Sequence, residues 1–447
     1  MLASRAVKAR ALQPVDAASL NVFRLTFGLL LTLELARFFL HGWIDSHFLA
    51  PSFLFKYQGF GWVALPPGDR IYWVFGAIGA LSIMVALGLF YRLAIVGLFC
   101  GFSYVFLLEQ ASYLNQYYLV LCVLLLLCFL PAERGWSLDS RRRGGDRCRT
   151  VPRWTIWALR GQFELMLIYA GLVKLNPDWL SGQPLEIWLG AHGEAPLVGG
   201  LLASRAVALA ASYGVIALHL IGAPLLLWRP ARLPVFFCYL LFHLANSVLF
   251  QIGLFPWLTI IGTLIFFEPD WPRRVWSRLS PNRQSHPPEI SRASPANSLP
   301  RSSRVVIALL IVQLLVPLRG LLYPGRASWT EEGQWFAWRM KLDDKRCEAR
   351  LLLRGPDGSL LREVEPGDLL PERQTMLVSG NPDMLVQFAG HIAGDAFAAA
   401  QGEGHGVTAD VWCALNGRRP QQLIDPLVDL TTVSRGLMHY DWVLPLR

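Results

Sequence analysis

The sequence predicts a polytopic α-helical membrane bundle of about nine spans, followed by a small, mostly-β extracytoplasmic domain. The first observation behind this prediction is composition, because 53% of the 447 residues are hydrophobic and only 16% are charged, against roughly 25% charged in soluble domains. The second is distribution, since the apolar residues gather before about residue 325 in runs near the roughly 20 residues that cross a bilayer. These features exclude a disordered chain, a disulfide-rich secreted scaffold and a single soluble globular protein.

Hydropathy windows place the candidate spans near residues 19–40, 71–90, 92–109, 116–131, 154–175, 206–228, 232–252, 254–268 and 304–323. No cleavable signal precedes the first span, because Arg5, Lys8 and Arg10 lead into Pro14 rather than into an apolar core. We therefore expect a transmembrane domain over residues 1–323, with a cytoplasmic linker at about 269–303, and a second domain over 324–447.

Loop charges predict the orientation. The segments 132–153 and 269–304 are rich in arginine, and the positive-inside rule places both in the cytoplasm. The segments 41–70, 110–115 and 176–205 contain few basic residues and alternate to the other side. This alternation makes the chain a multi-pass integral membrane protein whose C-terminal domain is extracytoplasmic.

The C-terminal tail changes character. Gly355-Pro356-Asp357-Gly358 is a strong turn signal between two short runs, and residues 384–400 read as one amphipathic helix. Strand-like patterns occupy residues 334–340, 348–354, 359–364 and 407–415. The tail is therefore expected to be mostly β with one helix.

The cysteines leave one question open. Cys347 and Cys413 both lie in the tail and could pair if it is extracytoplasmic, but sequence says nothing of their distance. The others in apolar runs read as small buried hydrophobes, and no pair has the spacing of a metal site. No metal is expected.

One span is unusually polar. A charge at mid-membrane costs roughly 2.5–3.5 kcal/mol, so ionisable residues there are functional candidates. Arg160 and Glu164 are four residues apart and can pair on a helix, and Lys174 stands in the last turn before the helix ends at Pro177. Lys174 has two readings: an amine that extends to the interface, or an amine in an apolar pocket, kept neutral so that it acts as a base.

Two further polar clusters remain ambiguous. His243, Asn246 and Ser247 share one helical face, where they could form a site or hold the bundle together by hydrogen bonds. Tyr113-Leu114-Asn115-Gln116-Tyr117-Tyr118 could equally be an aromatic belt at the interface. His219 reads as a packing or hydrogen-bonding residue. The arginine runs lack aromatic interleaving, so no nucleic acid is expected as a partner.

At these residues the chain resembles the vitamin K-dependent γ-glutamyl carboxylase family, the group with a horizontally transferred transmembrane domain, as a compact bacterial-type member. The resemblance covers nearly the whole chain. It rests on Pro14-Val15-Asp16-Ala17-Ala18-Ser19-Leu20, residues 113–118, Leu130-Pro131-Ala132, residues 170–179, residues 242–247, residues 252–257, Glu268-Pro269-Asp270-Trp271-Pro272, Trp329-Thr330-Glu331-Glu332-Gly333, residues 414–418 and Gln422-Leu423-Ile424-Asp425-Pro426.

The resemblance implies a reaction and roles. A lysine at the position of Lys174 deprotonates reduced vitamin K, a quinol of the menaquinol or phylloquinol type. Its oxygenation by O2 to the epoxide supplies the base that removes a γ-proton from a peptide glutamate, which then takes up CO2. The quinone and oxyanion site would include Asn115, Gln116, His243 and Asn246. Supporting residues would be Arg160, Glu164 and Tyr169. The partners would be a lipid quinone, the membrane (the cell inner membrane in a bacterium) and a glutamate-containing peptide or exported protein.

Two positions depart from the family pattern. Gln116 and Gln334 stand where the family and its bacterial-type members usually have histidine. Glutamine exchanges hydrogen bonds but takes no proton near neutral pH. Two alternatives therefore stay open: a quinone-binding or epoxidising relative that does not carboxylate, and a non-enzymatic membrane anchor for an exported partner.

Overall fold

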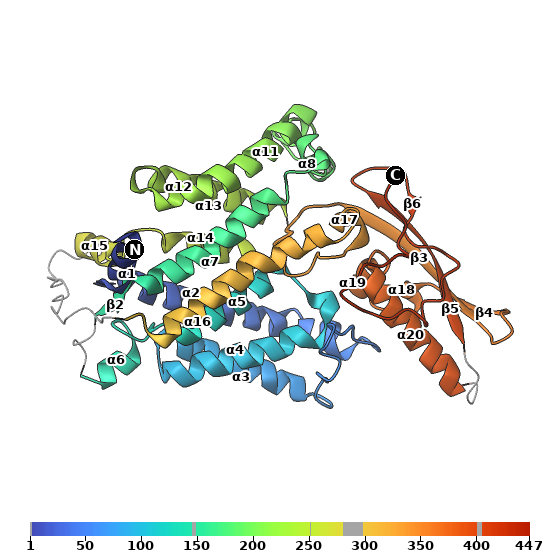
Figure 1. Ribbon diagram of the computed structural model, residues 1–447, viewed down its shortest axis with the longest axis horizontal. Helices are drawn as coiled ribbons and strands as arrows, with labels where there is room; N and C mark the ends of the chain where they lie inside the picture. Colours follow the sequence, from blue (N-terminus) through green and yellow to red (C-terminus); the bar gives the residue numbers. More distant parts are fainter. Residues whose placement is uncertain (1, 145–148, 251, 280–297, 400–404) are drawn as a thin grey trace.

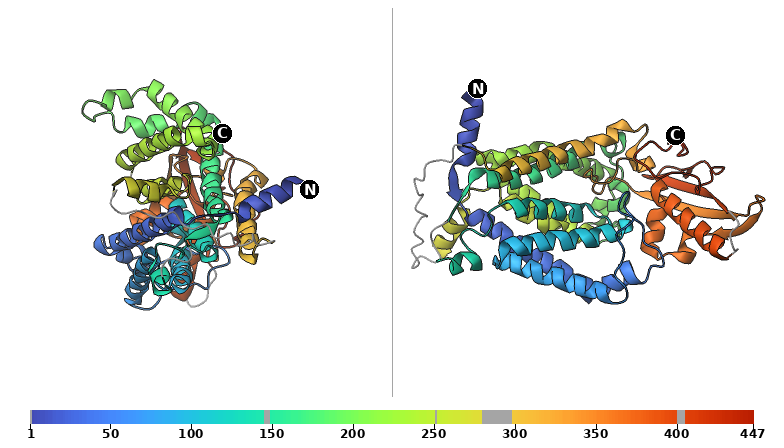
Figure 2. Two further views of the ribbon diagram at one scale, coloured as in Figure 1. Left: turned by 90° about the vertical axis from the view of Figure 1, so that its left-hand side faces the viewer. Right: turned by 60° about the horizontal axis from the view of Figure 1, so that its bottom comes forward.

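The computed structural model describes residues 2–144, 149–250, 252–279, 298–399 and 405–447. Long helices run side by side along one axis, and a smaller sheet-containing region caps one end of the bundle (Figures 1 and 2). The N-terminal helix α1 lies at the opposite end (Figure 1). The C-terminal cap therefore touches the ends of the bundle helices rather than their sides.

Among the described residues, the helical part forms nine helical segments along the bundle. They are α2 (Ala18–Leu40), α3 (Arg70–Leu87), α4 (Tyr91–Leu108), α5 (Asn115–Phe129), α7 (Arg153–Leu172), the continuous α11 (Arg205–Ala217), η3 (Leu218–Gly222) and α12 (Ala223–Leu227), then α13 (Arg229–Leu249), α14 (Phe255–Leu264), and α16 (Arg301–Leu315) with η4 (Val316–Leu322). Shorter elements connect them: α1 (Leu2–Leu12), η1 (Asp45–Leu49), η2 (Gln110–Ser112), α6 (Leu138–Arg142), α8 (Pro177–Leu180), α9 (Leu185–Gly190), α10 (Gly199–Leu202) and α15 (Trp271–Leu279).

Five of these segments, counted over the described residues, are long and apolar enough to cross a membrane. They are Arg70–Leu87, Tyr91–Leu108, Arg205–Leu227, Arg229–Leu249 and Arg301–Leu322. Two apolar helices, α5 and α14, are shorter, and α2 and α7 are not among the five. All nine predicted spans fall on helices, but the count of nine membrane crossings is not confirmed.

Close packing in the bundle depends on a glycine and a buried arginine, which a hydropathy profile does not single out. A Cβ on Gly28 would lie 2.8 Å from Ala86 Cα, so glycine allows α2 and α3 to approach at backbone distance. The buried Arg24 donates to the carbonyls of Val85, Ala86 and Trp136. Its charge therefore lies against the carbonyls at the C-terminal end of α3, where the helix dipole favours a cation.

A two-stranded ribbon closes the end of the bundle that lies away from the cap. Strand β1 (Pro14–Asp16) pairs antiparallel with β2 (Thr150–Pro152). Asp16 Oδ1 accepts from the backbone N–H of Ala18 at 2.8 Å, and Asp16 Oδ2 pairs with Arg273 Nε at 2.7 Å. The Pro14-Val15-Asp16 motif thus caps α2 and ties it to α15.

The C-terminal region is built on a four-stranded antiparallel sheet in the order β4-β3-β5-β6. Its elements are α17 (Ala327–Thr330), β3 (Lys345–Arg354), β4 (Leu360–Val364), α18 (Pro366–Leu369), α19 (Glu372–Val378), α20 (Pro382–Ala399), β5 (Gly406–Leu415) and β6 (Gln421–Gln422). The predicted hairpin around Gly355–Gly358 and the predicted strand near 407–415 are present. Cys347 and Cys413 lie opposite each other on β3 and β5 and form a disulfide, which answers the question that sequence left open.

Two details of the tail differ from expectation. Residues 334–340 form turns and irregular backbone rather than a strand, because Phe336 and Trp338 adopt positive φ of 59° and 57°. Helices α17, α18 and α19 add to the one helix that was expected, which is present as α20. The linker predicted at about 269–303 begins with α15, and its residues 280–297 lie outside the described part of the chain.

Candidate functional site

A cavity of about 1680 Å³ lies between the bundle and the C-terminal region. Its walls come from α2, α4, α5, the α7–α8 turn, α11 with η3, α13, α14 and α19. Most of the lining is aromatic or aliphatic, with a few polar side chains among them. A large apolar cavity with few convergent polar groups is the usual form of a small-molecule site.

Lys174 lies in the wall of this cavity, two residues beyond the last residue of α7. The residue is 5% exposed, and its Nζ donates to the carbonyl of Ala170 at 2.9 Å and to that of Met340 at 3.2 Å. Nζ also lies 5.0 Å from the centre of the Trp179 ring. The side chain therefore turns inward rather than towards the outer interface.

Burial shifts the protonation of this amine. Desolvation lowers the pKa of Lys174 to about 7, Asp343 opposes the shift, and Arg339 adds to it. A neutral amine has two N–H donors, and the two carbonyls accept both. The remaining lone pair is then available to take a proton.

The turn after Lys174 has a clear local cause. α7 ends at Leu172, earlier than the predicted end at Pro177, and Pro177 instead begins α8. Asn176 caps α8, since its Oδ1 accepts from the backbone N–H groups of Asp178 and Trp179, both at 3.1 Å. Trp179 Nε1 donates to Leu342 O at 2.8 Å, so the capped turn also holds the C-terminal region.

Asp178 joins two distant motifs. Its carboxylate accepts hydrogen bonds from Asn416 Nδ2 at 2.8 Å and from both Nη atoms of Arg418, and Arg326 lies 3.4 Å away. Burial raises the pKa of Asp178, but the hydrogen bonds from Arg418 and Asn416 and the positive charges of Arg418 and Arg326 outweigh it, so the pKa is lowered. The carboxylate is therefore ionised and clamps the C-terminal region onto the Lys174 turn.

The cluster at residues 113–118 meets the irregular segment 334–340. Tyr113 accepts at its hydroxyl from the Phe336 N–H at 2.9 Å, and Asn115 Nδ2 donates to Arg339 O at 3.3 Å. The Tyr118 ring lies 4.7 Å from that of Trp338. The segment 334–340 thus covers this end of the cavity and delivers Met340 O to Lys174.

The two glutamines at the departing positions differ in role. Gln116 lines the cavity, and its side chain makes no hydrogen bond with any described residue. Gln334 does not line it; its Oε1 accepts from Arg339 Nε at 2.7 Å. Gln116 is therefore free to meet a ligand, whereas Gln334 orients Arg339.

The histidine cluster is divided by the structure. Asn246 and Ser247 line the cavity, but His243 is buried beside it, against Tyr239 and Phe255. Both ring nitrogens of His243 are without a partner in the described part of the chain. His243 is therefore not part of the cavity wall, and its role towards a quinone stays a prediction.

His219, which sequence assigned to packing, does line the cavity. Its Nδ1 lies 2.8 Å from Val215 O, which requires a proton on Nδ1 and leaves Nε2 as an acceptor. Gly171 permits this position, because a Cβ there would lie 2.8 Å from the Cβ of His219. The feature of the sequence that could have indicated a close neighbour here is Gly171, which shares one helix face with Lys174.

The supporting residues do not line the cavity. The expected Arg160–Glu164 pair is absent: Arg160 Nε and Nη2 instead donate to Ile265 O and Phe267 O, each at 2.9 Å. The physical reason is that α14 ends there with unpaired carbonyls. Both carboxylate oxygens of Glu164 lack a hydrogen-bond partner among the described residues. Tyr169 donates from its hydroxyl to Leu314 O and so holds α16.

Sequence reasoning missed several charged residues of the lining. Glu34 in α2 accepts from Tyr117 Oη at 2.9 Å and pairs with Arg37 at 2.7 Å. From the C-terminal side, Lys341 and Arg373 reach the same cavity. An acidic residue within the first predicted span was the available signal for Glu34, whereas nothing in the sequence places Arg373 here. No group of three or more metal-ligating side chains occurs in the described ranges.

Two comparisons identify the family. Residues 12–271 match the HTTM domain, and residues 301–447 match the lumenal domain of vitamin K-dependent gamma-carboxylase. No solved structure matches the chain. The lumenal match places the C-terminal region on the non-cytoplasmic side, as the loop charges predicted. With a membrane bundle, a lumenal-type domain and a buried lysine between them, the chain belongs to the gamma-glutamyl carboxylase family.

Proposed function

We propose that the protein is a vitamin K-dependent γ-carboxylase that couples oxygenation of a reduced quinone to carboxylation of peptide glutamate, with Lys174 as the base that deprotonates the quinol. The observation that carries this proposal is the Lys174 amine, which is buried, held by two carbonyls and lowered in pKa to about 7. No carboxylate of the described residues forms an ion pair with Nζ. An amine of this kind is poised to accept a proton at physiological pH.

The cavity fits a lipid quinone. Leu29, Leu33 and Trp257 line it and are also exposed on the surface of the bundle, so its wall reaches the lipid-facing side. Gln116 and Asn246 have free side-chain amides in the lining, and these can donate to quinone oxygens or to a developing oxyanion. A quinol can thus enter from the bilayer and present its oxygen to Lys174.

The opposite side suits a peptide. Arg373 and Lys341 come from the C-terminal region, where Arg373 Nη2 donates to Ala111 O at 3.0 Å and Lys341 Nζ lies 5.1 Å from the Trp188 ring. Both residues line the cavity, and Glu34 is the only acidic residue among the lining residues. This excess of positive charge favours a glutamate carboxylate arriving from water.

The mostly apolar lining also serves the chemistry. When bound, the reduced quinone supplies with O2 the strong base that removes the γ-proton, and CO2 then adds to the resulting carbanion. Water would quench both the strong base and the carbanion. The aromatic walls and the segment 334–340 restrict the access of water to Lys174. In this proposal the residues of the chain position the quinol, deprotonate it and shield the reactive species from water.

The test is incubation of the purified protein with reduced vitamin K, O2, labelled CO2 and a glutamate peptide, followed by mass spectrometry for epoxide and carboxylated peptide. Lys174→Ala should lower epoxide formation by about 10²–10⁴-fold. Lys174→Met keeps the side-chain volume as a packing control, and the exposed Lys8→Ala is the matched lysine control. Epoxidation by Lys174→Ala at the wild-type rate would remove the base assignment.

Gln116 favours a second candidate, a relative that epoxidises the quinone but does not carboxylate. The same assay separates the candidates, because epoxide without labelled peptide identifies that relative. If neither product forms but a peptide or exported protein still binds, the result identifies the membrane anchor.

A further inference from the structure

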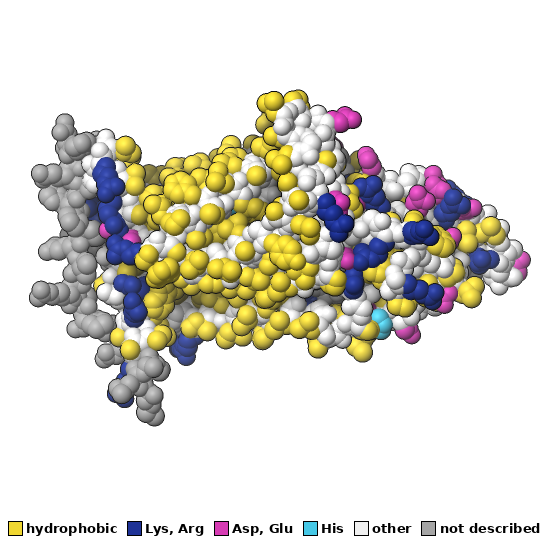
Figure 3. All heavy atoms as spheres, turned by 90° about the horizontal axis from the view of Figure 1, so that it is seen from above, with side chains coloured by type: hydrophobic (Ala, Val, Ile, Leu, Met, Phe, Trp, Pro, Cys, Tyr) yellow, Lys and Arg dark blue, Asp and Glu magenta, His cyan; other side chains and the backbone are white. Residues whose placement is uncertain are grey.

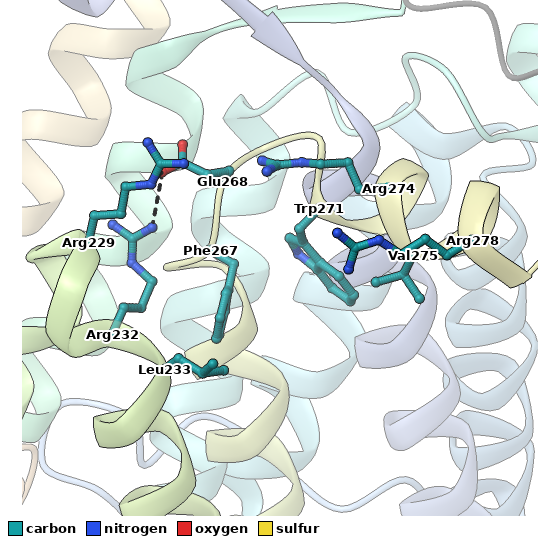
Figure 4. A pocket seen from close by; sticks show the side chains of 9 residues that line it. All are labelled: Arg229, Arg232, Leu233, Phe267, Glu268, Trp271, Arg274, Val275 and Arg278. Atoms are coloured by element: carbon teal, nitrogen blue, oxygen red, sulfur yellow. Dashed lines mark hydrogen bonds and ion pairs between the residues drawn. The ribbon is translucent and has the colours of Figure 1, made fainter.

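A second pocket lies at the end of the bundle away from the C-terminal region. It has a volume of about 270 Å³ and is formed by the start of α13, the turn after α14, and α15 (Figure 4). Four arginines line it, Arg229, Arg232, Arg274 and Arg278. The single acidic residue in the lining is Glu268.

The positive charge of this pocket is only partly neutralised. Arg232 is 7% exposed, and its Nε and Nη2 donate to the carbonyls of Leu226 and Leu227 at 2.9 and 3.3 Å. Arg232 and Arg229 share one oxygen of Glu268, at 3.3 and 3.7 Å. One carboxylate therefore faces two guanidinium groups, of which that of Arg232 is fixed by backbone carbonyls.

The other wall adds two more cations. Arg274 pairs with Asp270, which lies outside the pocket lining, and Arg278 has no hydrogen bond or ion pair with any described residue. Figure 4 shows the side chains of Arg229 and Arg232 on one wall and those of Arg274 and Arg278 on the other. The space between the walls is a site for an anion, since guanidinium groups bind phosphate oxygens well.

The pocket also has an apolar side. Leu233, Phe267, Trp271 and Val275 line it, and Figure 4 shows the Phe267 ring between the two pairs of arginines and Leu233 below it. Leu233 is 53% exposed and Val275 is 44% exposed. A ligand with a charged head and apolar chains fits this division better than a soluble anion does.

The position agrees with such a ligand. Hydrophobic side chains cover the middle of the bundle, and Lys and Arg gather at the end opposite the C-terminal region (Figure 3). Because that region is non-cytoplasmic, this basic end lies at the cytoplasmic surface of the membrane. In α15 the exposed Val275, Trp276 and Leu279 alternate with arginines, the pattern of a helix that lies in the interface.

We propose that this pocket binds the phosphate headgroup of an anionic phospholipid from the cytoplasmic leaflet, with its acyl chains against Leu233 and the neighbouring exposed Phe237. The arginines therefore do more than set topology: Arg232 is held in place by backbone carbonyls and, with Arg229, pairs with Glu268, and the four arginines line one pocket. This proposal does not depend on the catalytic activity. Basic pockets of this kind at the cytoplasmic ends of membrane helices bind lipid headgroups.

The test uses native mass spectrometry of the purified full chain titrated with phosphatidylglycerol or phosphatidylcholine. The double variant Arg274→Gln with Arg278→Gln changes two exposed side chains of the pocket. The matched control, Arg301→Gln with Arg304→Gln, removes the same charge from two exposed residues at the start of α16, outside the pocket. Size-exclusion profiles and melting temperatures confirm that each variant is folded.

We expect the wild type and the control to bind phosphatidylglycerol more tightly than phosphatidylcholine, and the pocket variant to bind it about tenfold or more weakly. Glycerol phosphate and inorganic phosphate at equal concentration should not displace the lipid. Displacement by either would assign the pocket to a soluble anion and overturn the lipid proposal. Equal loss in the pocket and control variants, or no preference between the two lipids, would also overturn it, since either result indicates general surface charge.

Discussion

Arg418 donates to both carboxylate oxygens of Asp178, across 240 residues of chain, and so fastens the C-terminal region to the turn that carries Lys174. Asn416 adds a hydrogen bond to the same carboxylate at 2.8 Å. Lys174 itself completes the connection through Met340 O. The geometry of the amine thus depends on how the two regions dock.

The first prediction follows from this contact. Asp178→Asn should weaken docking, because the half-buried guanidinium of Arg418 loses its charged partner, at a cost of about 1–3 kcal/mol. We expect a lower melting temperature and faster proteolysis of residues 324–447, together with slower epoxidation. Arg346→Gln, which breaks the exposed pair with Asp344, is the matched control and should change none of these three quantities. Unchanged proteolysis in Asp178→Asn would show that other contacts dock the region.

The second prediction concerns pH. The Lys174 amine works as a base only when neutral, and burial lowers its pKa from 10.5 to about 7. The rate of epoxide formation should therefore rise as pH increases through about 7 and then level off. In Lys174→Ala the rise of the rate with pH near 7 should vanish. Small primary amines should restore part of the epoxidation activity, and should restore more of it at higher pH. A wild-type rate that does not change between about pH 6 and pH 9 would contradict a titrating amine.

The third prediction tests the departure at Gln116. Because Gln116 lines the cavity and is free of hydrogen bonds to described residues, a histidine there would add a group that can carry a proton. Gln116→His should raise epoxide formation without changing expression or melting temperature. Gln334→His is the comparison, since Gln334 contacts Arg339 and not the cavity. No change, or a fall, in Gln116→His would show that the amide serves by hydrogen bonding alone.

The fourth prediction concerns orientation. A cysteine at Gly358, in the β3–β4 turn, should react with membrane-impermeant thiol reagents in intact cells, because the lumenal-type region faces away from the cytoplasm. A cysteine at Ser285, which lies outside the described residues, should react only after the membrane is permeabilised. The measurement is gel-shift labelling of each variant before and after permeabilisation. The opposite labelling pattern would contradict this topology. It would also contradict the cytoplasmic location of the arginine-lined pocket.

The parts of the fold that sequence predicts well are those with local causes. The Gly355–Gly358 turn predicts the β3–β4 hairpin because these residues favour turns by their own backbone chemistry. The helix predicted near 384–400 follows from apolar spacing alone. By contrast, residues 334–340 alternate like a strand but cross the end of the cavity, where Phe336 and Trp338 take positive φ to pack against Tyr113 and Tyr118. Tertiary packing overrides the pattern there.

The site shows the same division. Lys174 stands out in sequence because an ionisable residue beside a span is costly. Its second acceptor, Met340 O, comes from a contact between distant segments that no local pattern encodes. The Arg160–Glu164 prediction fails for a related reason: spacing allows the pair, but the carbonyls at the end of α14 lie closer to the guanidinium. His243 likewise shares a helix face with Asn246 but turns out of the cavity lining.

The contact between Lys174 and the Met340 carbonyl can form only late in the synthesis and folding of this protein. Every bundle residue around Lys174 is synthesised before residue 340, yet the amine lacks one of its two acceptors until the chain has crossed back and the lumenal-type region has folded over it. A nascent bundle, or a product truncated in the last span, would carry the lysine without the finished site. The contact that completes the surroundings of the Lys174 amine therefore forms only after the C-terminal region has been translated and translocated.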